Sequence, residues 1–279
     1  MNPNPLARFF RQPAIYLKLP SQGRGWPAGS IDLPANGELP ILPMTAMDEI
    51  TYRTPDALFN GEATVSVIRS CVPNIQDPWA IPSIDLDAIL IAIRIASVGH
   101  EMDLDSTCPK CQHENSFGLD LRTVLDKLQG GNFEQPLNQG DMTFYFRPLT
   151  YREMSDNSLL QFEQQKTIQM LDSAENLPDD QKVDQLNRMM KAMVELTVKA
   201  LSHSISEIRL PDATVREHQY IEEFLNNCDR QLFTKVRDHV IGLEEKSELQ
   251  ALTVTCVSCQ NQYEQVFTLD MSRFFGPAS

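Results

Sequence analysis

The sequence contains two short cysteine motifs, Cys108-Pro109-Lys110-Cys111 and Cys256-Val257-Ser258-Cys259, and these decide its fold. Each motif has two residues between its cysteines, a spacing that lets one tight turn direct both sulfur atoms at a common centre. The flanking residues alternate between apolar and polar types, which is typical of two strands joined by a turn. Together the motifs supply the four thiolates that a structural zinc ion prefers, with every ligand position filled. We therefore predict one structural zinc per chain, bound by Cys108, Cys111, Cys256 and Cys259.

The long separation of the two motifs leaves alternatives open. Residues 112–255 lie between them, whereas a compact zinc ribbon has about 15–20 residues at that point. A site that has lost its metal and a redox dithiol are the alternatives, although a redox motif should open a helix and neither motif does. His113 is a further candidate ligand, but its position favours an exposed turn. Cys71 and Cys228 lie on apolar faces of predicted helices, which favours core positions.

The first 44 residues differ in composition from the rest of the chain. They hold eight of the 18 prolines and four of the 12 glycines, a density that excludes a helix and allows only short extended pieces. Large apolar side chains such as Phe9, Phe10 and Trp26 argue against a free tail. We therefore expect residues 1–44 to form an extended arm that covers either its own domain or a partner.

Three further parts follow the arm. Residues 45–147 should contain short helices with the first motif and its strands, 148–243 a helical insertion, and 244–279 the second motif. Within the insertion, Thr214–Glu217 indicates a capping box before one helix, and Gly242 indicates the end of another. Strands are expected at 101–107, 114–121, 142–146, 250–255 and 263–269. The predicted fold class is α+β, with a zinc-ribbon-like β module packed on helices, a helical insertion and an extended N-terminal arm.

Two of the expected helices have distinctive apolar patterns. Residues 83–99 are apolar on most sides, which predicts a central, buried helix. In the insertion, Met189, Met190 and Met193 belong to an apolar face with helical spacing. Such a face is usually part of a core, and the alternative is a groove for a partner helix, because methionine surfaces adapt to different ligands.

The charge balance argues against binding to phosphates or membranes. The chain has 24 Lys and Arg against 38 Asp and Glu, a formal net charge of −14. Near the cysteine motifs, Lys110 stands alone among acidic residues, which is the wrong sign for a nucleic-acid partner. The longest apolar run is far below the about 20 residues of a membrane-spanning helix, and the first residues do not resemble a secretory signal. We therefore expect assembly in the cytoplasm, where thiols stay reduced.

Catalytic signatures are missing from the sequence. The five histidines do not form a metal-ligand spacing, and no nucleophile elbow or phosphate-binding loop occurs. Carboxylate pairs occur only where a helix start, a strand edge or a loop accounts for them. We therefore predict that the protein is not an enzyme and has no small-molecule substrate.

A series of short segments between Leu17 and Asp120 carries a resemblance to a known family. The segments are Leu17–Ser21, Leu42–Glu49, Asp56–Ala63, Val67–Val72, Asp87–Gly99 and Cys108–Cys111. Taken in this order, they resemble a family of baseplate proteins from contractile-tailed bacteriophages. The helical stretch 150–245 carries no such resemblance.

The resemblance implies a non-enzymatic structural subunit in the hub region of the tail baseplate. Its location would be the virion, and its partners would be other baseplate or hub proteins, with copies of itself among the candidates. The alternative is a hub or tail assembly chaperone that is absent from the mature virion. A third class, a metalloenzyme or a zinc-dependent nucleic-acid binder, would need an open metal position or a basic surface.

Overall fold

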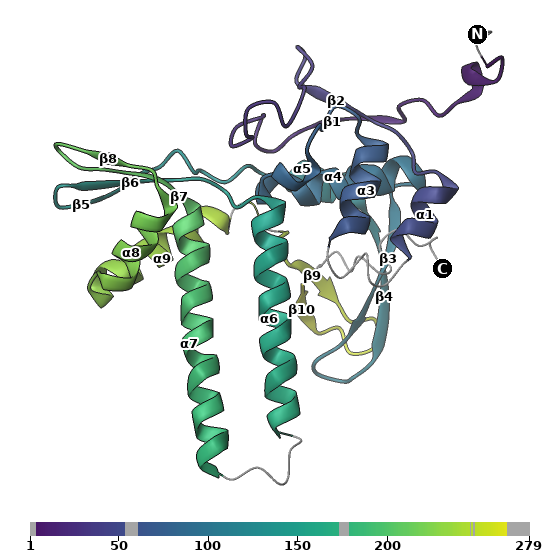
Figure 1. Ribbon diagram of the computed structural model, residues 1–279. Coiled ribbons are helices and arrows are strands. Elements are labelled where there is room, and N and C mark those ends of the chain that lie inside the picture. Colours follow the sequence, from purple (N-terminus) through teal and green to yellow (C-terminus); the bar gives the residue numbers. More distant parts are fainter. Residues whose placement is uncertain (1–3, 54–60, 173–178, 246, 248, 267–279) are drawn as a thin grey trace. The chain divides into compact units, whose positions relative to one another are not determined.

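The chain divides into two compact units. The computed structural model describes residues 4–53, 61–172, 179–245, 247 and 249–266, with the backbone alone for 168–172 and 179–186. Unit 1 comprises Met1–Gly130 and Ser247–Ser279, and unit 2 comprises Gly131–Lys246. The inserted unit thus begins before residue 148, because the strands just ahead of that residue pair within unit 2. Figure 1 shows the elements of both units.

Unit 1 is built around helix α4, Ser83–Ser97. Ten of its residues are buried, which confirms the central helix predicted from its apolar composition. Strands β1, Ile15–Lys18, and β2, Glu38–Ile41, form an antiparallel pair and contact α4. Helices α1, Ala46–Tyr52, and α3, Glu62–Cys71, contact each other, and α3 also contacts α4. The sequence also predicts a short helix that begins after Pro55, and residues 54–60 lie outside the described part of the chain.

Most of the expected arm is part of unit 1. Leu17, Leu39 and Ile41 are buried in its core, so this stretch covers its own domain. Further toward the N-terminus, the Arg11 guanidinium donates hydrogen bonds to the carbonyl oxygens of Pro43 and Ser70, at 2.6 and 2.7 Å. The chain is therefore fixed to unit 1 from residue 11 onward.

A buried carboxylate joins the arm to α4. The sequence offers Ser83 or Asp85 as the N-cap of this helix, but Pro82 occupies the N-cap position without a side-chain hydrogen bond. Asp85 instead accepts hydrogen bonds from the backbone N–H of Ser21 at 2.8 Å, the Ser21 hydroxyl at 2.5 Å and the Trp26 indole N–H at 2.6 Å. Because its side chain has no exposure to solvent, these donors replace the water that a carboxylate requires.

Two antiparallel hairpins complete unit 1. The first consists of β3, Glu101–Thr107, and β4, Glu114–Asp120, and is followed by α5, Leu121–Lys127. The second consists of β9, Leu252–Thr255, and β10, Gln262–Gln265. The strands flanking both cysteine motifs are therefore confirmed. The predicted end of the last strand, at 267–269, lies outside the described residues.

In its described residues, unit 2 combines a small sheet with four helices. Its sheet has the antiparallel order β5-β6-β7-β8. The sequence predicts a helical insertion, whereas the inserted unit also contains this sheet. The strands are β5, Leu137–Gln139; β6, Met142–Phe146; β7, Ile205–Arg209; and β8, Thr214–Val215. The helices are α6, Tyr151–Asp172; α7, Asp179–Ser204; α8, His218–Asn227; and α9, Arg230–Glu244.

Two local predictions in unit 2 are wrong. Thr214 begins β8 instead of capping a helix, because Thr214 and Val215 pair with β7. Helix α9 continues through Gly242 to Glu244, since Leu243 is buried in the core of the unit. In both cases a tertiary contact outweighs a local sequence signal.

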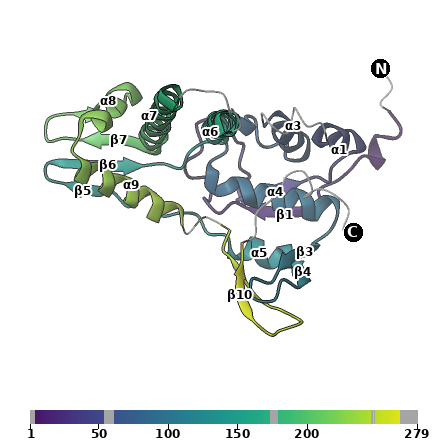
Figure 2. The same cartoon turned by 90° about the horizontal axis from the view of Figure 1, so that it is seen from below.

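Helices α6 and α7 form an antiparallel pair, seen from the side in Figure 1 and nearly end-on in Figure 2. The methionines assigned to a core are mostly exposed, with exposed fractions of 60% for Met190 and 54% for Met193. The core of unit 2 lies at one end of the pair, around Phe144, Ile205 and Ile221. Among the described residues, no helix has both the length and the apolar character needed to cross a membrane.

Candidate metal centre

The two hairpins of unit 1 bring the four predicted cysteines together. Their sulfur atoms all lie within 4.8 Å of one another. The Sγ atoms of Cys108 and Cys259 are 3.7 Å apart, and those of Cys111 and Cys256 are also 3.7 Å apart. A tetrahedral zinc ion with Zn–S distances of about 2.3 Å would separate its sulfurs by about 3.8 Å. The thiols therefore have the number, chemistry and spacing of a closed four-cysteine zinc site.

The two motifs share one backbone geometry. In the first, the N–H of Cys108 donates to the carbonyl of His113 and the N–H of Gln112 donates to the carbonyl of Cys108, both at 2.9 Å. In the second, the N–H groups of Cys256 and Gln260 form the equivalent bonds at 2.9 and 3.0 Å. Gln112 and Gln260 both adopt left-handed φ angles, 59° and 57°. The same turn thus directs two sulfurs inward at each hairpin tip.

The hairpin tips favour thiolates at two of the four positions. The backbone N–H of Cys259 lowers the pKa of Cys256 to about 6. Burial acts to raise the pKa of Cys108, but backbone N–H groups, with that of Cys111 first, outweigh it and lower the pKa. Because metals bind the thiolate form, such N–H groups prepare the site for a cation.

The remaining candidates lie outside the cluster. Cys71 is fully buried, and burial raises its pKa to about 12, so it is a neutral core thiol as predicted. Cys228 is only half-buried, at the C-terminal end of α8. His113 contributes its backbone carbonyl to the turn and is not part of the four-thiol group. Both motifs lie at hairpin tips and not at helix starts, which removes the support for a redox dithiol.

Polar contacts join the hairpins independently of any metal. Asn115 is buried, donates to the carbonyl of His113 at 3.0 Å and accepts the N–H of Val257 at 3.0 Å. The Ser106 hydroxyl lies 2.9 Å from the Tyr263 hydroxyl. The sequence did not indicate that Ser106 and Asn115 would connect the two hairpins. The available signal was two polar residues at cross-strand partner positions beside the first motif, Ser106 and Asn115.

The chain matches a known protein family over most of its length. A family model described as T4 bacteriophage base plate protein matches residues 33–276, a stretch that includes both cysteine motifs. The chain belongs to this family. It is a bacteriophage baseplate protein, and the resemblance found in the sequence is confirmed. No curated protein and no solved structure matches the chain.

Removing the Asn115 side chain should loosen the hairpins of this baseplate protein. In an Asn115→Ala variant the N–H of Val257 loses the oxygen of the buried Asn115 side chain as its acceptor, which costs about 0.5–1.5 kcal/mol of unfolding free energy. Urea unfolding followed by the fluorescence of the chain measures the loss. Asn226→Ala is the matched control, because that exposed amide bonds only within α8, and it should change stability by less than about 0.5 kcal/mol. Equal stability of the two variants would contradict this role of Asn115.

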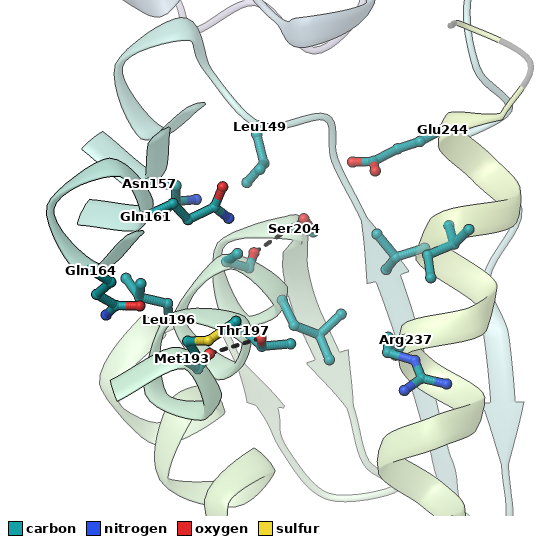
Figure 3. Close-up of a pocket in the computed structure, with 14 residues that line it drawn as sticks. Leu149, Asn157, Gln161, Gln164, Met193, Leu196, Thr197, Ser204, Arg237 and Glu244 are labelled. Atoms are coloured by element: carbon teal, nitrogen blue, oxygen red, sulfur yellow. Dashed lines mark hydrogen bonds between the residues drawn. The ribbon is translucent and has the colours of Figure 1, made fainter. Parts of the chain in front are cut away.

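A separate concavity lies in unit 2 of the baseplate protein, between α6, α7 and α9, with a volume of about 360 Å³. Figure 3 shows Asn157 and Gln161 on α6 across from Met193 on α7. The Thr197 and Ser204 hydroxyls donate to carbonyls of their own helix, at 2.9 and 3.2 Å. The residues that line the concavity include no histidine or cysteine. Nothing in this lining is arranged as a nucleophile with a base.

Proposed function

We propose that this baseplate protein is a non-enzymatic structural subunit in the hub region of a contractile tail, stabilised by one zinc ion per chain. The observation that supports the proposal is the cluster of four thiols, whose sulfur atoms lie within 4.8 Å of one another, in a chain that belongs to a family of baseplate proteins. Four thiolates fill every position around zinc, so the ion would have no open site for catalysis. The partners are other baseplate or hub proteins, with no role for nucleic acid, membrane or small-molecule substrate.

The proposed zinc has a mechanical role that follows from the chain path. Cys108 and Cys111 precede unit 2 in sequence, and Cys256 and Cys259 follow it. A metal ion bound to all four would tie together the two segments that leave and re-enter unit 1. Because a two-stranded hairpin such as β9-β10 is only marginally stable alone, we infer that zinc holds it against the first hairpin. A subunit stiffened in this way suits an assembly that transmits force.

The N-terminal segment offers a surface for a baseplate neighbour. Leu6, Phe9 and Phe10 have exposed fractions between 58% and 69%, and the short 3-10 helix Ala7–Phe9 has no buried residue. Arg11 fixes the chain immediately after this segment. We propose that residues 4–10 become buried when the subunit joins its neighbours in the virion, after assembly in the host cytoplasm.

The arm and the subunit role are tested together in phage particles. A tagged full-length chain, supplied during infection, should be found at fixed stoichiometry in purified virions by quantitative mass spectrometry. A chain lacking residues 1–10 should fold with unchanged stability and be at least about tenfold depleted from virions, because three exposed apolar anchors are lost. A longer deletion is unsuitable, since residues such as Leu17 and Ser21 belong to the core of unit 1.

A double variant serves as a control for chain length. Phe9→Ser with Phe10→Ser keeps the segment and should reproduce the depletion, whereas Tyr16→Ser, also at an exposed aromatic residue, should incorporate normally. Normal incorporation of the shortened chain would refute the role of the segment. Absence of the full-length chain from mature virions would instead identify a hub or tail assembly chaperone, the alternative that the exposed Met190 and Met193 favour.

A further inference from the structure

An apolar stripe on α7 extends beyond the core of unit 2. Met190, Val194, Val198 and Leu201 follow spacings of four, four and three residues, so they share one face of the helix. Val198 and Leu201 are buried in the core, with exposed fractions of 3% and 6%. Met190 and Val194 continue the same face with exposed fractions of 60% and 61%. One continuous apolar surface is therefore half covered.

Helix α6 does not cover the exposed half. Met189 and Ala192 on α7 line a concavity together with Leu160 and Gln164 on α6, so they mark the face of α7 that is turned toward α6. Met190 lies one residue, about 100°, around the helix from Met189. The uncovered stripe is thus a separate face.

The helix pair lacks the burial that such long helices need. Helices α6 and α7 have 22 and 26 residues. Among the described side chains of residues 151–197, none is buried. Most helical stability in proteins comes from packing an amphipathic face, so burial of the stripe by a surface outside this unit would stabilise the helix pair.

We propose that the stripe formed by Met190 and Val194 binds the same stripe of a second copy of this chain, antiparallel across a two-fold axis. Lys191 and Glu195 flank the stripe, form an i,i+4 ion pair at 3.9 Å and are well exposed. In an antiparallel pair related by a two-fold axis, the charge order of one helix meets the reversed order of the other. Lys191 of each copy then faces Glu195 of the other copy, so the charges are self-complementary.

The proposal does not depend on zinc or on the N-terminal segment, and its failure would leave the proposed subunit role in place.

Analytical ultracentrifugation of the full chain tests the proposal. We expect a reversible dimer at micromolar concentration, and a monomer for Val194→Glu with unchanged circular dichroism. Lys191→Glu alone should weaken dimerisation by about tenfold through like charges. Lys191→Glu combined with Glu195→Lys should restore it, because the opposite signs face each other again. Because the double variant also restores the ion pair within the helix, the decisive readout is a mixture of the single variants Lys191→Glu and Glu195→Lys. Neither should dimerise well alone, but together they should form a mixed dimer in which opposite charges face each other.

Lys199→Glu is the matched control, since it reverses an exposed charge on the same helix outside the stripe and should leave the dimer intact. A wild-type chain that remains monomeric at high micromolar concentration would overturn the proposal and would assign the stripe to a different protein. A dimer that survives Val194→Glu would overturn it too, because the contact would then lie elsewhere.

Discussion

Replacing Cys256 with serine should abolish zinc binding and separate the two hairpins of unit 1. The purified wild-type chain should contain about one zinc per chain by plasma mass spectrometry, without added metal. The Cys256→Ser variant should contain less than about a tenth of that amount, because a serine hydroxyl remains protonated and is a poor ligand for zinc. Cys111, whose sulfur lies 3.7 Å from that of Cys256, would lose this sulfur as a neighbour, and only three thiol ligands would remain.

The energetic consequence should be large. Structural zinc contributes about 10–16 kcal/mol of apparent binding free energy in small zinc-binding domains near pH 7, and this energy is coupled to folding. Part of it is offset here by contacts such as the Asn115–Val257 hydrogen bond, which hold the hairpins without metal. We therefore expect the variant to lower the melting temperature of unit 1 by about 10 °C or more. Chelation of the wild-type metal should give the same change.

Cys228→Ser is the matched control for this experiment. Cys228 is a half-buried thiol in unit 2, outside the four-thiol group, so the variant should keep its full zinc content. A wild-type protein without zinc, or a Cys256→Ser variant with unchanged metal content and stability, would contradict the proposed site.

The second large effect is expected at Asp85, the buried carboxylate between the arm and α4. In Asp85→Ala, the backbone N–H and hydroxyl of Ser21 and the indole N–H of Trp26 lose their acceptor. Two donors of the buried Ser21 and the indole N–H of the half-buried Trp26 would then lack a partner, which should cost about 3–5 kcal/mol of unfolding free energy. Chemical denaturation measures this loss. Trp26→Phe removes one donor and leaves the carboxylate bonded to Ser21, so its effect should be smaller.

Asp85 also predicts a specific dependence of stability on pH. Burial raises the pKa of Asp85 above its ordinary 3.8, against the opposing hydrogen bonds from Ser21 and Trp26. Between 3.8 and the raised pKa, the folded state therefore binds more protons than the unfolded state. The free energy of unfolding must then decrease as pH rises through that window and stay level above it. Asp85→Asn should remove this component, which the difference between the two pH profiles isolates.

Asp105→Ala provides the control for both measurements. Asp105 is an exposed carboxylate on β3 of the same unit, and its loss should change stability by less than about 0.5 kcal/mol. Equal stability of Asp85→Ala and Asp105→Ala would show that the three bonds to Asp85 contribute nothing. A flat difference profile for Asp85→Asn would refute the pH argument.

Local patterns predicted much of unit 1 and less of unit 2. The strands around the cysteine motifs and the helix at 83–97 follow from alternation and apolar runs, because these patterns record how each element meets its core. In unit 2, the strand Ile205–Arg209 follows directly after α7, and the sequence predicts a helical insertion there instead of a strand. Its strand state depends on pairing with Met142–Phe146, a partner about 60 residues away in sequence.

The sequence by itself determined the chemistry of the candidate site and its family. Four cysteines in two matching motifs specify thiolate ligands, because residue spacing alone sets the local turn. The tertiary structure decided what spacing within one motif does not encode. It brought Cys108 and Cys259 to 3.7 Å, fixed Asp85 to the arm, and left Met190 and Val194 uncovered. The physical reason is that these outcomes depend on contacts between residues far apart in the chain, and such contacts form only when the whole unit folds.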